Sequence, residues 1–272
     1  MHDARTLEAL GLSVVPREHP LSYPGVWPRR SGLLYGDRLL PLHPMAQQPP
    51  GAWSLDPEPH TEPVALDTFL ARHGHARTED RVPLLAVGSN ASPAQLRHKL
   101  RDDAVVPMTR ARVTGIGIGV SAHVSLMGYV SASPFRAQGA PRELFVLWLD
   151  VDQLRMIDAS EGLFTPGGNY QRLALSSSSV QLESGQLLDG VQLYVNRRGV
   201  LHNGSPRPRP HGGQSALLTS LLSESARLRE LFGGTPEEFV ARARGDRALC
   251  AAGTRLFAEE GWTTPSGLET PG

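Results

Sequence analysis

The chain has 272 residues, in which 27 Lys and Arg balance 27 Asp and Glu, and 40% of its residues are hydrophobic. This balance argues against nucleic acid as a partner, because phosphate binding shows as a basic excess, and the apolar content excludes wholesale disorder. No apolar run approaches the ~20 residues that span a bilayer. The first residues carry an early acid and no sustained apolar stretch, so we expect no membrane partner, no secretory signal and a soluble, cytoplasmic protein. Cys250 is the single cysteine, which excludes an internal disulfide and a thiolate cage around a metal.

Residues 1–81 are predicted to form an N-terminal accessory segment. Apolar runs at 32–35 and 38–42 flank Gly36 and Asp37, which is typical of a hairpin in which glycine leads a type II′ turn. Seven prolines between positions 41 and 63 predict an extended loop. Thr61 is predicted to cap a short helix that ends at Gly74.

Residues 82–213 are predicted to form the core, with more strands than helices. An apolar run at 83–87 ends at Gly88, and Ser92 followed by Pro93 predicts the start of a helix. A second helix is predicted at 152–160, and further strands at 112–121, 124–131, 144–151, 170–175 and 190–196. Long crossover helices are few, so the pattern favours an α+β fold over a doubly wound sheet.

Residues 214–272 are predicted to be a helical segment. Leucines recur at helical spacing through 215–232, and Gly233 follows them, which predicts one amphipathic helix. Thr235 and Pro236 with an acidic first turn predict a second helix, and a third is expected at 246–260. The two terminal segments are expected either to roof a pocket or to form an oligomer contact, and the oligomeric state stays open.

The first candidate site is the predicted junction of strand, loop and helix at 87–93. Gly88 at the end of the strand would let the backbone turn sharply and let a ligand approach closely. The N–H groups that follow, near a helix N-terminus, favour an anion such as a carboxylate or a phosphate. The alternative is a turn and helix cap that bind nothing.

The second candidate is Glu161, which directly precedes Gly162 at the end of a predicted apolar helix. A carboxylate buried there at the mouth of a sheet could act first as a general base and then as a general acid. The alternative is a solvated helix C-terminus, where most carboxylates simply face water.

Taken in order, these segments resemble the gamma-glutamylcyclotransferase-like superfamily. The family pattern is an aromatic residue followed by Gly-Ser-Asn after the first strand, then a glutamate in a Leu-Asp-x-x-Glu-Gly segment, then a Tyr-x-Arg strand. The corresponding residues here are Val87-Gly88-Ser89-Asn90, Ile157-Asp158-Ala159-Ser160-Glu161-Gly162 and Tyr170-Gln171-Arg172. The resemblance covers residues 82–206 and implies a small mixed β-barrel-like core with an N-terminal extension and C-terminal helices.

The resemblance also implies roles for individual residues. Glu161 would be the catalytic acid/base, and Tyr170 would line the pocket, with Tyr194 as a further candidate. The backbone cradle for the α-carboxylate of a γ-glutamyl substrate would be formed by Gly88, Ser89, Asn90 and Ala91. The chain departs from the family at Val87, where a tyrosine is usual, so a hydroxyl and an aromatic wall are missing beside the cradle.

The implied activity is that of a gamma-glutamyl cyclotransferase that uses no cofactor and no metal. The substrate's own α-amine would attack the γ-carbonyl, and Glu161 would carry a proton to the leaving nitrogen and release 5-oxoproline. Two alternatives stay open: a non-catalytic binding module for an acidic metabolite, and an amide hydrolase in which water replaces the internal amine. The leaving group is not identified.

Other features are given no chemistry at this point. Lys99, the only lysine in the chain, is attributed to coding bias. The glycines at 115, 117 and 119 lack the spacing of a dinucleotide-binding loop and predict a strand. Solvated or core positions are expected for the histidines, which lack metal-ligand spacing: His73, His75, His123, His202 and His211.

Overall fold

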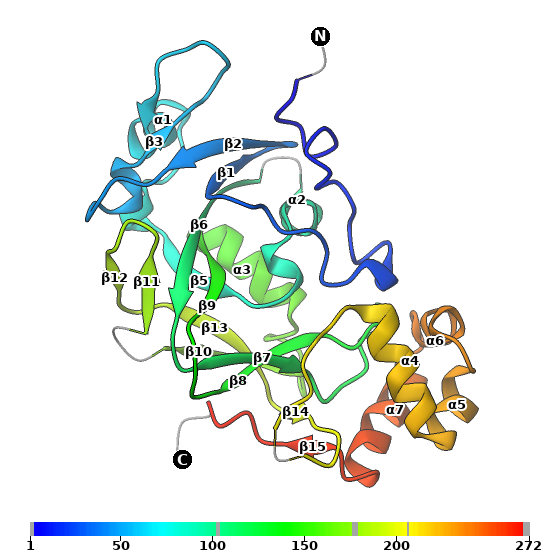
Figure 1. Ribbon diagram of the computed structural model, residues 1–272. Helices are drawn as coiled ribbons and strands as arrows, with labels where there is room; N and C mark the ends of the chain where they lie inside the picture. Colours follow the sequence, from blue (N-terminus) through cyan, green and yellow to red (C-terminus); the bar gives the residue numbers. More distant parts are fainter. Residues whose placement is uncertain (1–2, 102–103, 176–178, 206, 269–272) are drawn as a thin grey trace.

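The computed structural model describes residues 3–101, 104–175, 179–205 and 207–268. A mixed β-sheet lies at its centre, with helices on its surface and at one end (Figure 1). The strands are β1 (Gly32–Tyr35), β2 (Arg38–His43), β3 (Ser54–Leu55), β4 (Val64–Ala65), β5 (Val82–Ala86), β6 (Val105–Val113), β7 (Ile116–Val120), β8 (Ala132–Arg136), β9 (Arg142–Leu149), β10 (Tyr170–Ala174), β11 (Val180–Leu182), β12 (Leu187–Leu188), β13 (Gln192–Asn196), β14 (Val200–Leu201) and β15 (Thr263–Thr264). The helices are α1 (Leu66–Arg72), α2 (Pro93–Leu100), α3 (Val151–Ser160), α4 (Gln214–Glu224), α5 (Ala226–Phe232), α6 (Pro236–Ala243) and α7 (Arg247–Glu259), with 3-10 turns η1 (Pro20–Ser22), η2 (Pro50–Ala52), η3 (Thr78–Asp80) and η4 (Ser89–Ala91).

The main sheet has the strand order β10-β13-β5-β9-β6-β1-β2-β3-β4, and β11 also pairs with β6. Strands β5 and β13 run parallel, whereas the other neighbours along this order are antiparallel. The predicted mixed α+β class is therefore confirmed. The described strands do not close into a barrel, because β10 and β4 stand at opposite ends of this order.

The sheet is covered on both faces, which explains the continuous apolar run of β5. Successive residues of a strand point to opposite faces. Leu84 packs with α2 and α3 through Leu96 and Ile157, whereas Leu85 faces the cluster around Trp53 and the helix α1. Because α2 and α3 share one face, the loop before α2 and the end of α3 are held near each other.

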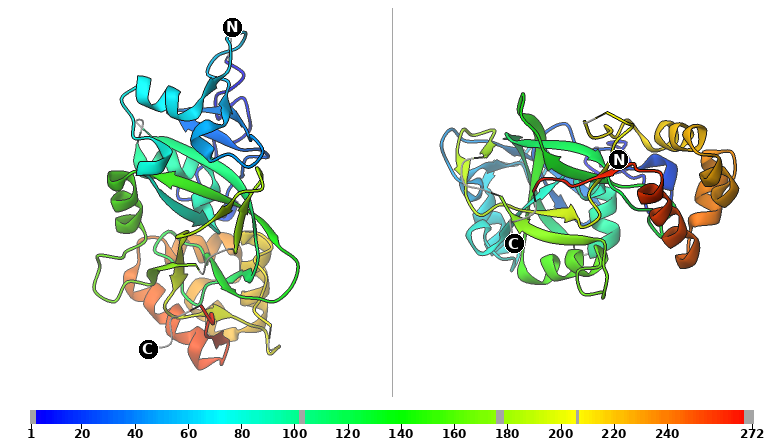
Figure 2. Two further views of the ribbon diagram at one scale, coloured as in Figure 1. Left: turned by 90° about the vertical axis from the view of Figure 1, so that its left-hand side faces the viewer. Right: turned by 90° about the horizontal axis from the view of Figure 1, so that it is seen from below.

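The C-terminal helices form a separate core at the end of the molecule opposite α1 (Figure 2). Leu218, Phe232, Phe239 and Phe257 from α4 to α7 are fully buried there. Val124, in the loop between β7 and β8, packs into the same cluster. This loop therefore joins the helical end to the sheet.

Several sequence predictions are confirmed with small shifts in their boundaries. The hairpin of β1 and β2 turns at Gly36 with φ +59°, and Asp37 does not share the positive φ, as a type II′ turn requires. The predicted strands at β5, β10 and β13 and the helices at α2, α3, α6 and α7 are present. Strand β1 also pairs with β6, so this hairpin of the N-terminal segment belongs to the main sheet.

Three predictions are wrong for identifiable reasons. Residues 124–131 form a loop, and the strand is β8; the loop is apolar because it packs against helices. The predicted helix at 215–232 is two helices, since the Ser225 hydroxyl accepts from the Leu228 N–H and starts α5. Thr61 caps no helix: its hydroxyl donates to the Glu58 carbonyl and α1 begins at Leu66.

The strand predicted at 112–121 is also wrong in its extent. Gly115, with φ +77°, separates β6 from β7 there. Most of β6 was not predicted.

Candidate functional site

Glu161 is the C-cap residue of α3, at the point where the backbone leaves the helix. Gly162 has φ +77°, a left-handed conformation that favours glycine. Its N–H donates to the Ala159 carbonyl at 3.1 Å and the Leu163 N–H donates to the Asp158 carbonyl at 3.0 Å, which is the Schellman pattern. The glycine of the motif therefore ends the helix directly behind the glutamate.

Asp158 attaches this end of α3 to the sheet. Its carboxylate accepts a hydrogen bond from the Tyr194 hydroxyl on β13 at 2.7 Å and lies 3.0 Å from Arg172 Nε on β10. Burial, and then the Asp158 carboxylate, raise the pKa of Tyr194, so its hydroxyl stays a donor. The Asp and Arg of two sequence motifs thus contact each other, and the contact fixes the helix end that carries Glu161.

The loop after β5 provides the opposite wall. Turn η4 links β5 to α2, with Ser92 at the N-cap and Pro93 in the first turn. In the part of the chain that the structure describes, the N–H groups of Ser89 and Asn90 donate to no acceptor, as is usual at the start of a helical turn. These two groups remain available to an anion.

Ala91 differs from Ser89 and Asn90 in that its N–H is not available to an anion. It is fully buried, does not line the cavity, and its N–H donates to the Gly88 carbonyl at 3.0 Å. Its N–H is therefore used inside the loop, which does not fit the cradle role expected for Ala91.

Lys99, given no chemistry from the sequence, lines the candidate site. Its ammonium on α2 lies 2.7 Å from Glu161 Oε1 and 2.8 Å from Asn90 Oδ1, and Asn90 Nδ2 donates to the same Glu161 oxygen at 3.1 Å. The side chains of Lys99 and Glu161 are 8% and 16% exposed. The expected alternative of a solvated glutamate is therefore excluded. The single lysine in an arginine-rich chain was the available signal for this position, but it does not indicate burial.

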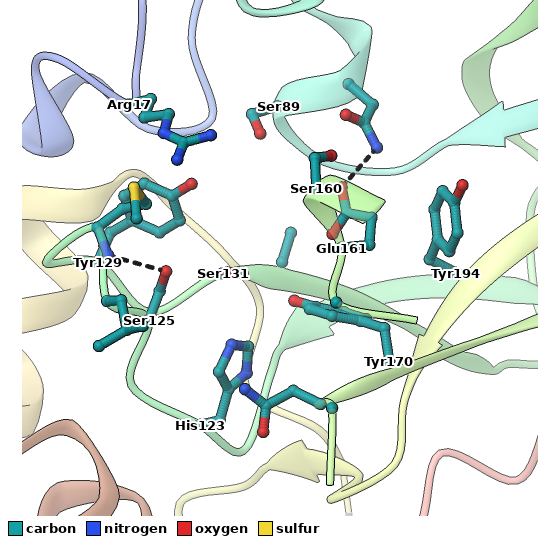
Figure 3. A pocket seen from close by; sticks show the side chains of 18 of the residues that line it. Arg17, Ser89, His123, Ser125, Tyr129, Ser131, Ser160, Glu161, Tyr170 and Tyr194 are labelled. Carbon is teal, nitrogen blue, oxygen red and sulfur yellow. Dashed lines mark hydrogen bonds between the residues drawn. The ribbon is translucent and has the colours of Figure 1, made fainter. Parts of the chain in front are cut away.

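These groups line a cavity of about 340 Å³ shown in Figure 3. Gly88, Ser89, Asn90, Glu161, Tyr170 and Tyr194 all face it, so the structure brings the sequence candidates together except Ala91. Residues that sequence reasoning did not select also line it: Arg17, Tyr23, Lys99, His123, Tyr129 and Arg247. Lys99 lies on α2, close in sequence to the loop after β5. The other residues come from the two terminal segments and from the loop between β7 and β8, far from the motifs in sequence.

Tyr23 occupies the space beside Val87 and Gly88. A Cβ placed on Gly88 would lie 2.4 Å from the Tyr23 hydroxyl oxygen, so this position accommodates no larger residue without movement. The same oxygen accepts from the Ala132 N–H at 2.9 Å, and the ring stacks on Tyr129 with centroids 4.5 Å apart. The N-terminal segment thus supplies an aromatic ring and a hydroxyl beside the loop, where Val87 itself offers neither.

Tyr170 and His123 form the floor of the cavity in Figure 3. Their rings meet edge to face with centroids 5.4 Å apart, and His123 Nδ1 lies 2.7 Å from Asn196 Nδ2. Burial, and then the Arg198 charge, lower the pKa of His123 to about 4, so this ring is neutral near pH 7. Burial and the Glu161 carboxylate raise the pKa of Tyr170. The floor therefore carries no charge.

No helix within the described ranges is long and apolar enough to cross a bilayer.

No protein-family model and no curated protein matches the sequence. Solved structures that are similar to part of the chain include an uncharacterized protein from Homo sapiens, with 19% identity and a TM-score of 0.33 over 43% of this chain and 67% of that one. A gamma-glutamyl cyclotransferase matches with 18% identity and a TM-score of 0.34 over 42% of this chain and 66% of that one. YkqA from Bacillus subtilis matches with 12% identity and a TM-score of 0.32, over 56% of this chain and 52% of that one. The chain thus spans about two thirds of the first two structures and half of the third.

Proposed function

We propose that this chain is a gamma-glutamyl cyclotransferase-type enzyme, which cleaves a γ-glutamyl compound into 5-oxoproline and an amine or amino acid. The observation that supports this most strongly is the placement of Glu161. Its carboxylate lies in a cavity that is also lined by Ser89 and Asn90, whose N–H groups have no acceptor within the described ranges. A proton acceptor and an anion-binding loop in one cavity are what the cyclisation of a γ-glutamyl amide requires.

The substrate would bind through its amino-acid end. Its α-carboxylate would accept from the N–H groups of Ser89 and Asn90 and would lie near the Lys99 ammonium. Its α-ammonium would approach Glu161 Oε2, because Oε1 already accepts from Lys99 and Asn90. Binding both groups folds the substrate, so that the α-nitrogen faces its own γ-carbonyl. Such an arrangement supplies much of the acceleration through proximity.

Glu161 would then move the protons. It accepts one from the α-ammonium, the freed amine attacks the γ-carbonyl carbon, and the carbon–nitrogen bond to the leaving group breaks as its nitrogen is protonated. Overall the α-nitrogen loses two protons and the leaving nitrogen gains two, so the amine departs as an ammonium. The oxyanion formed on the way would need hydrogen-bond donors, for which the loop at 88–90 is the candidate.

A non-catalytic binding module remains the second candidate, and the Lys99–Glu161 ion pair is the observation that favours it. A carboxylate held by an ammonium 2.7 Å away can bind a substrate's ammonium without accepting its proton. The two proposals differ in whether any γ-glutamyl compound is converted.

The test is a mass-spectrometric screen of γ-glutamyl amines and peptides with wild type, Glu161→Gln and Glu260→Gln. Glu260 is a matched control, because it occupies the C-cap of α7 as Glu161 does that of α3. We expect wild type and Glu260→Gln to release 5-oxoproline and Glu161→Gln to be slower by roughly 10²- to 10⁴-fold, the usual contribution of a general acid/base. Full turnover by Glu161→Gln would overturn the proposed role of this residue. Binding without turnover in wild type would favour the module.

A further inference from the structure

The charged side chains that line the cavity do not balance. Arg17, Lys99 and Arg247 are cations and Glu161 is an anion, while His123 is neutral near pH 7. Lys99 and Glu161 form an ion pair. The guanidinium groups of Arg17 and Arg247 therefore remain without a countercharge in the lining, and a ligand that fills the cavity meets a net positive surface.

Arg17 has an anchored backbone and an unpaired side chain. Its N–H donates to Gln95 Oε1 at 3.0 Å, and its carbonyl accepts from the Arg244 guanidinium at 3.3 Å. Gln95 on α2 is 1% exposed, so the anchor is itself buried. Within the described ranges the Arg17 guanidinium makes no hydrogen bond or ion pair. An unpaired guanidinium on an anchored backbone is available to pair with an anionic ligand group.

Figure 3 shows the position of this cation relative to the proposed reaction centre. The Arg17 side chain reaches toward the cavity on the side of Tyr129, across from Glu161 and Tyr170. Burial raises the pKa of the Tyr129 phenol, and the positive charge of Arg17 opposes this rise because it favours the ionised phenol. The amino-acid end of the substrate is assigned to Glu161, Lys99 and the loop at 88–90, so the leaving group would extend toward Arg17.

We propose that Arg17 selects substrates whose leaving group carries a carboxylate, such as γ-glutamyl amino acids and peptides, over γ-glutamyl amines. This inference rests on the proposed function. A γ-glutamyl amine brings one ammonium and one carboxylate and leaves both Arg17 and Arg247 without a countercharge. A γ-glutamyl amino acid brings a second carboxylate on its leaving group. Its α-ammonium would pair with Glu161, its α-carboxylate with Lys99, and the second carboxylate with Arg17.

The test compares γ-glutamylalanine with γ-glutamylethylamide, which differ only in the carboxylate of the leaving group. Release of 5-oxoproline is measured for wild type, Arg17→Gln and Arg155→Gln. Arg155 is a suitable control because it lies on α3 with its side chain 71% exposed and does not line the cavity. Thermal unfolding of each variant checks that it is folded.

We expect wild type and Arg155→Gln to favour γ-glutamylalanine in kcat/KM by about 10- to 100-fold, the range of one charge-assisted hydrogen bond. Arg17→Gln should lose most of this preference by slowing γ-glutamylalanine alone. Equal turnover of the two compounds by wild type, or an equal loss for both in Arg17→Gln, would overturn the inference. If neither compound yields 5-oxoproline, the proposed function fails, and calorimetric binding of the same pair decides: a preference for γ-glutamylalanine that depends on Arg17 supports the inference, and its absence overturns it.

Discussion

Glu161 has one carboxylate oxygen that accepts two hydrogen bonds and one that is available. Oε1 accepts from Lys99 at 2.7 Å and from Asn90 at 3.1 Å, while within the described part of the chain Oε2 has no partner. The paired oxygen fixes the orientation of the side chain, and the other can meet a substrate ammonium. Lys99 is therefore proposed to position Glu161, in addition to lying near the substrate's α-carboxylate.

Replacing Lys99 tests this role. We expect Lys99→Met to lower kcat by roughly 10- to 100-fold, because an unfixed carboxylate is misplaced relative to the attacking amine. Lys99→Arg should recover most of the loss, since arginine restores a cation to the pair. The readout is 5-oxoproline release at saturating substrate. A fall in thermal stability with unchanged kcat in Lys99→Met would show that the lysine is structural.

The buried His123 predicts a pH dependence of stability. Its pKa is lowered to about 4 from the ordinary 6.5, so between these pH values the unfolded chain binds a proton that the folded chain does not. The stabilisation associated with the neutral, buried His123 should therefore be complete above pH 6.5. The free energy of unfolding should fall as the pH drops from 6.5 toward 4. Between pH 6.5 and pH 4, the free energy of unfolding of His123→Gln should fall by about 3 kcal/mol less than that of wild type, as measured by urea unfolding. Parallel losses in the two proteins would contradict the buried neutral histidine.

At the scale of elements, the ends of α3 and α7 are built alike. Gly261 follows Glu260 with φ +71°, and the Trp262 N–H donates to the Phe257 carbonyl at 2.9 Å, as the Leu163 N–H does to Asp158. A Cβ on Gly162 or Gly261 would meet nothing closer than 4.0 Å. The two positions differ in that only the end of α3 faces the cavity.

This likeness provides a matched pair of variants. Gly162→Ala and Gly261→Ala should each lower the free energy of unfolding by about 1 kcal/mol, because alanine disfavours a positive φ. Only Gly162→Ala should also lower kcat/KM, by roughly 10- to 100-fold, since it displaces Glu161. Chemical denaturation and 5-oxoproline release measure the two effects. Equal activity of the variants would show that the end of α3 does not position Glu161 for the proposed reaction.

Local patterns in the sequence predict the elements that carry the motifs. The Gly88 loop, the start of α2 at Ser92 and Pro93, and the Glu-Gly end of α3 each follow from a few adjacent residues. The apolar residues at 124–131 suggest a strand, but they form a loop whose side chains pack against the C-terminal helices. The leucine spacing continues across Ser225, so it does not indicate the break between α4 and α5. Such features depend on tertiary contacts that spacing alone does not show.

At the scale of the whole molecule, the cavity combines three parts of the chain. The N-terminal segment contributes Arg17 and Tyr23, the central sheet and its helices contribute Glu161 and Lys99, and the C-terminal helices contribute Arg247. Turn η1 of the N-terminal segment contacts both α4 and α6. The site residues within the motifs could be selected from sequence, whereas Arg17 and Tyr23 could not, because nothing in their local sequence indicates what they pack against.

The contact between Tyr23 and Gly88 tests this assembly. Gly88→Ala should be destabilising, because the new Cβ would lie 2.4 Å from the Tyr23 hydroxyl oxygen. The ring carbon that carries this hydroxyl would lie 3.5 Å away, an ordinary contact, so the clash is with the oxygen alone. Tyr23→Phe removes the hydroxyl and leaves the Ala132 N–H without its acceptor, at a cost of about 1 kcal/mol. We expect the double variant to be more stable than the sum of the single losses predicts, by about 1 kcal/mol in urea unfolding. Additive losses would mean that the N-terminal segment does not constrain the loop.

In the proposed reaction, the substrate's own amine attacks its γ-carbonyl with Glu161 as the proton carrier. The most direct measurement is product analysis by mass spectrometry after reaction of a γ-glutamyl compound in water enriched in ¹⁸O, with wild type and Glu161→Gln. Internal attack predicts 5-oxoproline without ¹⁸O from wild type and little or no product from Glu161→Gln. Glutamate labelled with ¹⁸O at its γ-carboxylate would show that water is the nucleophile and contradict the proposed reaction, and undiminished release by Glu161→Gln would contradict the role of the glutamate.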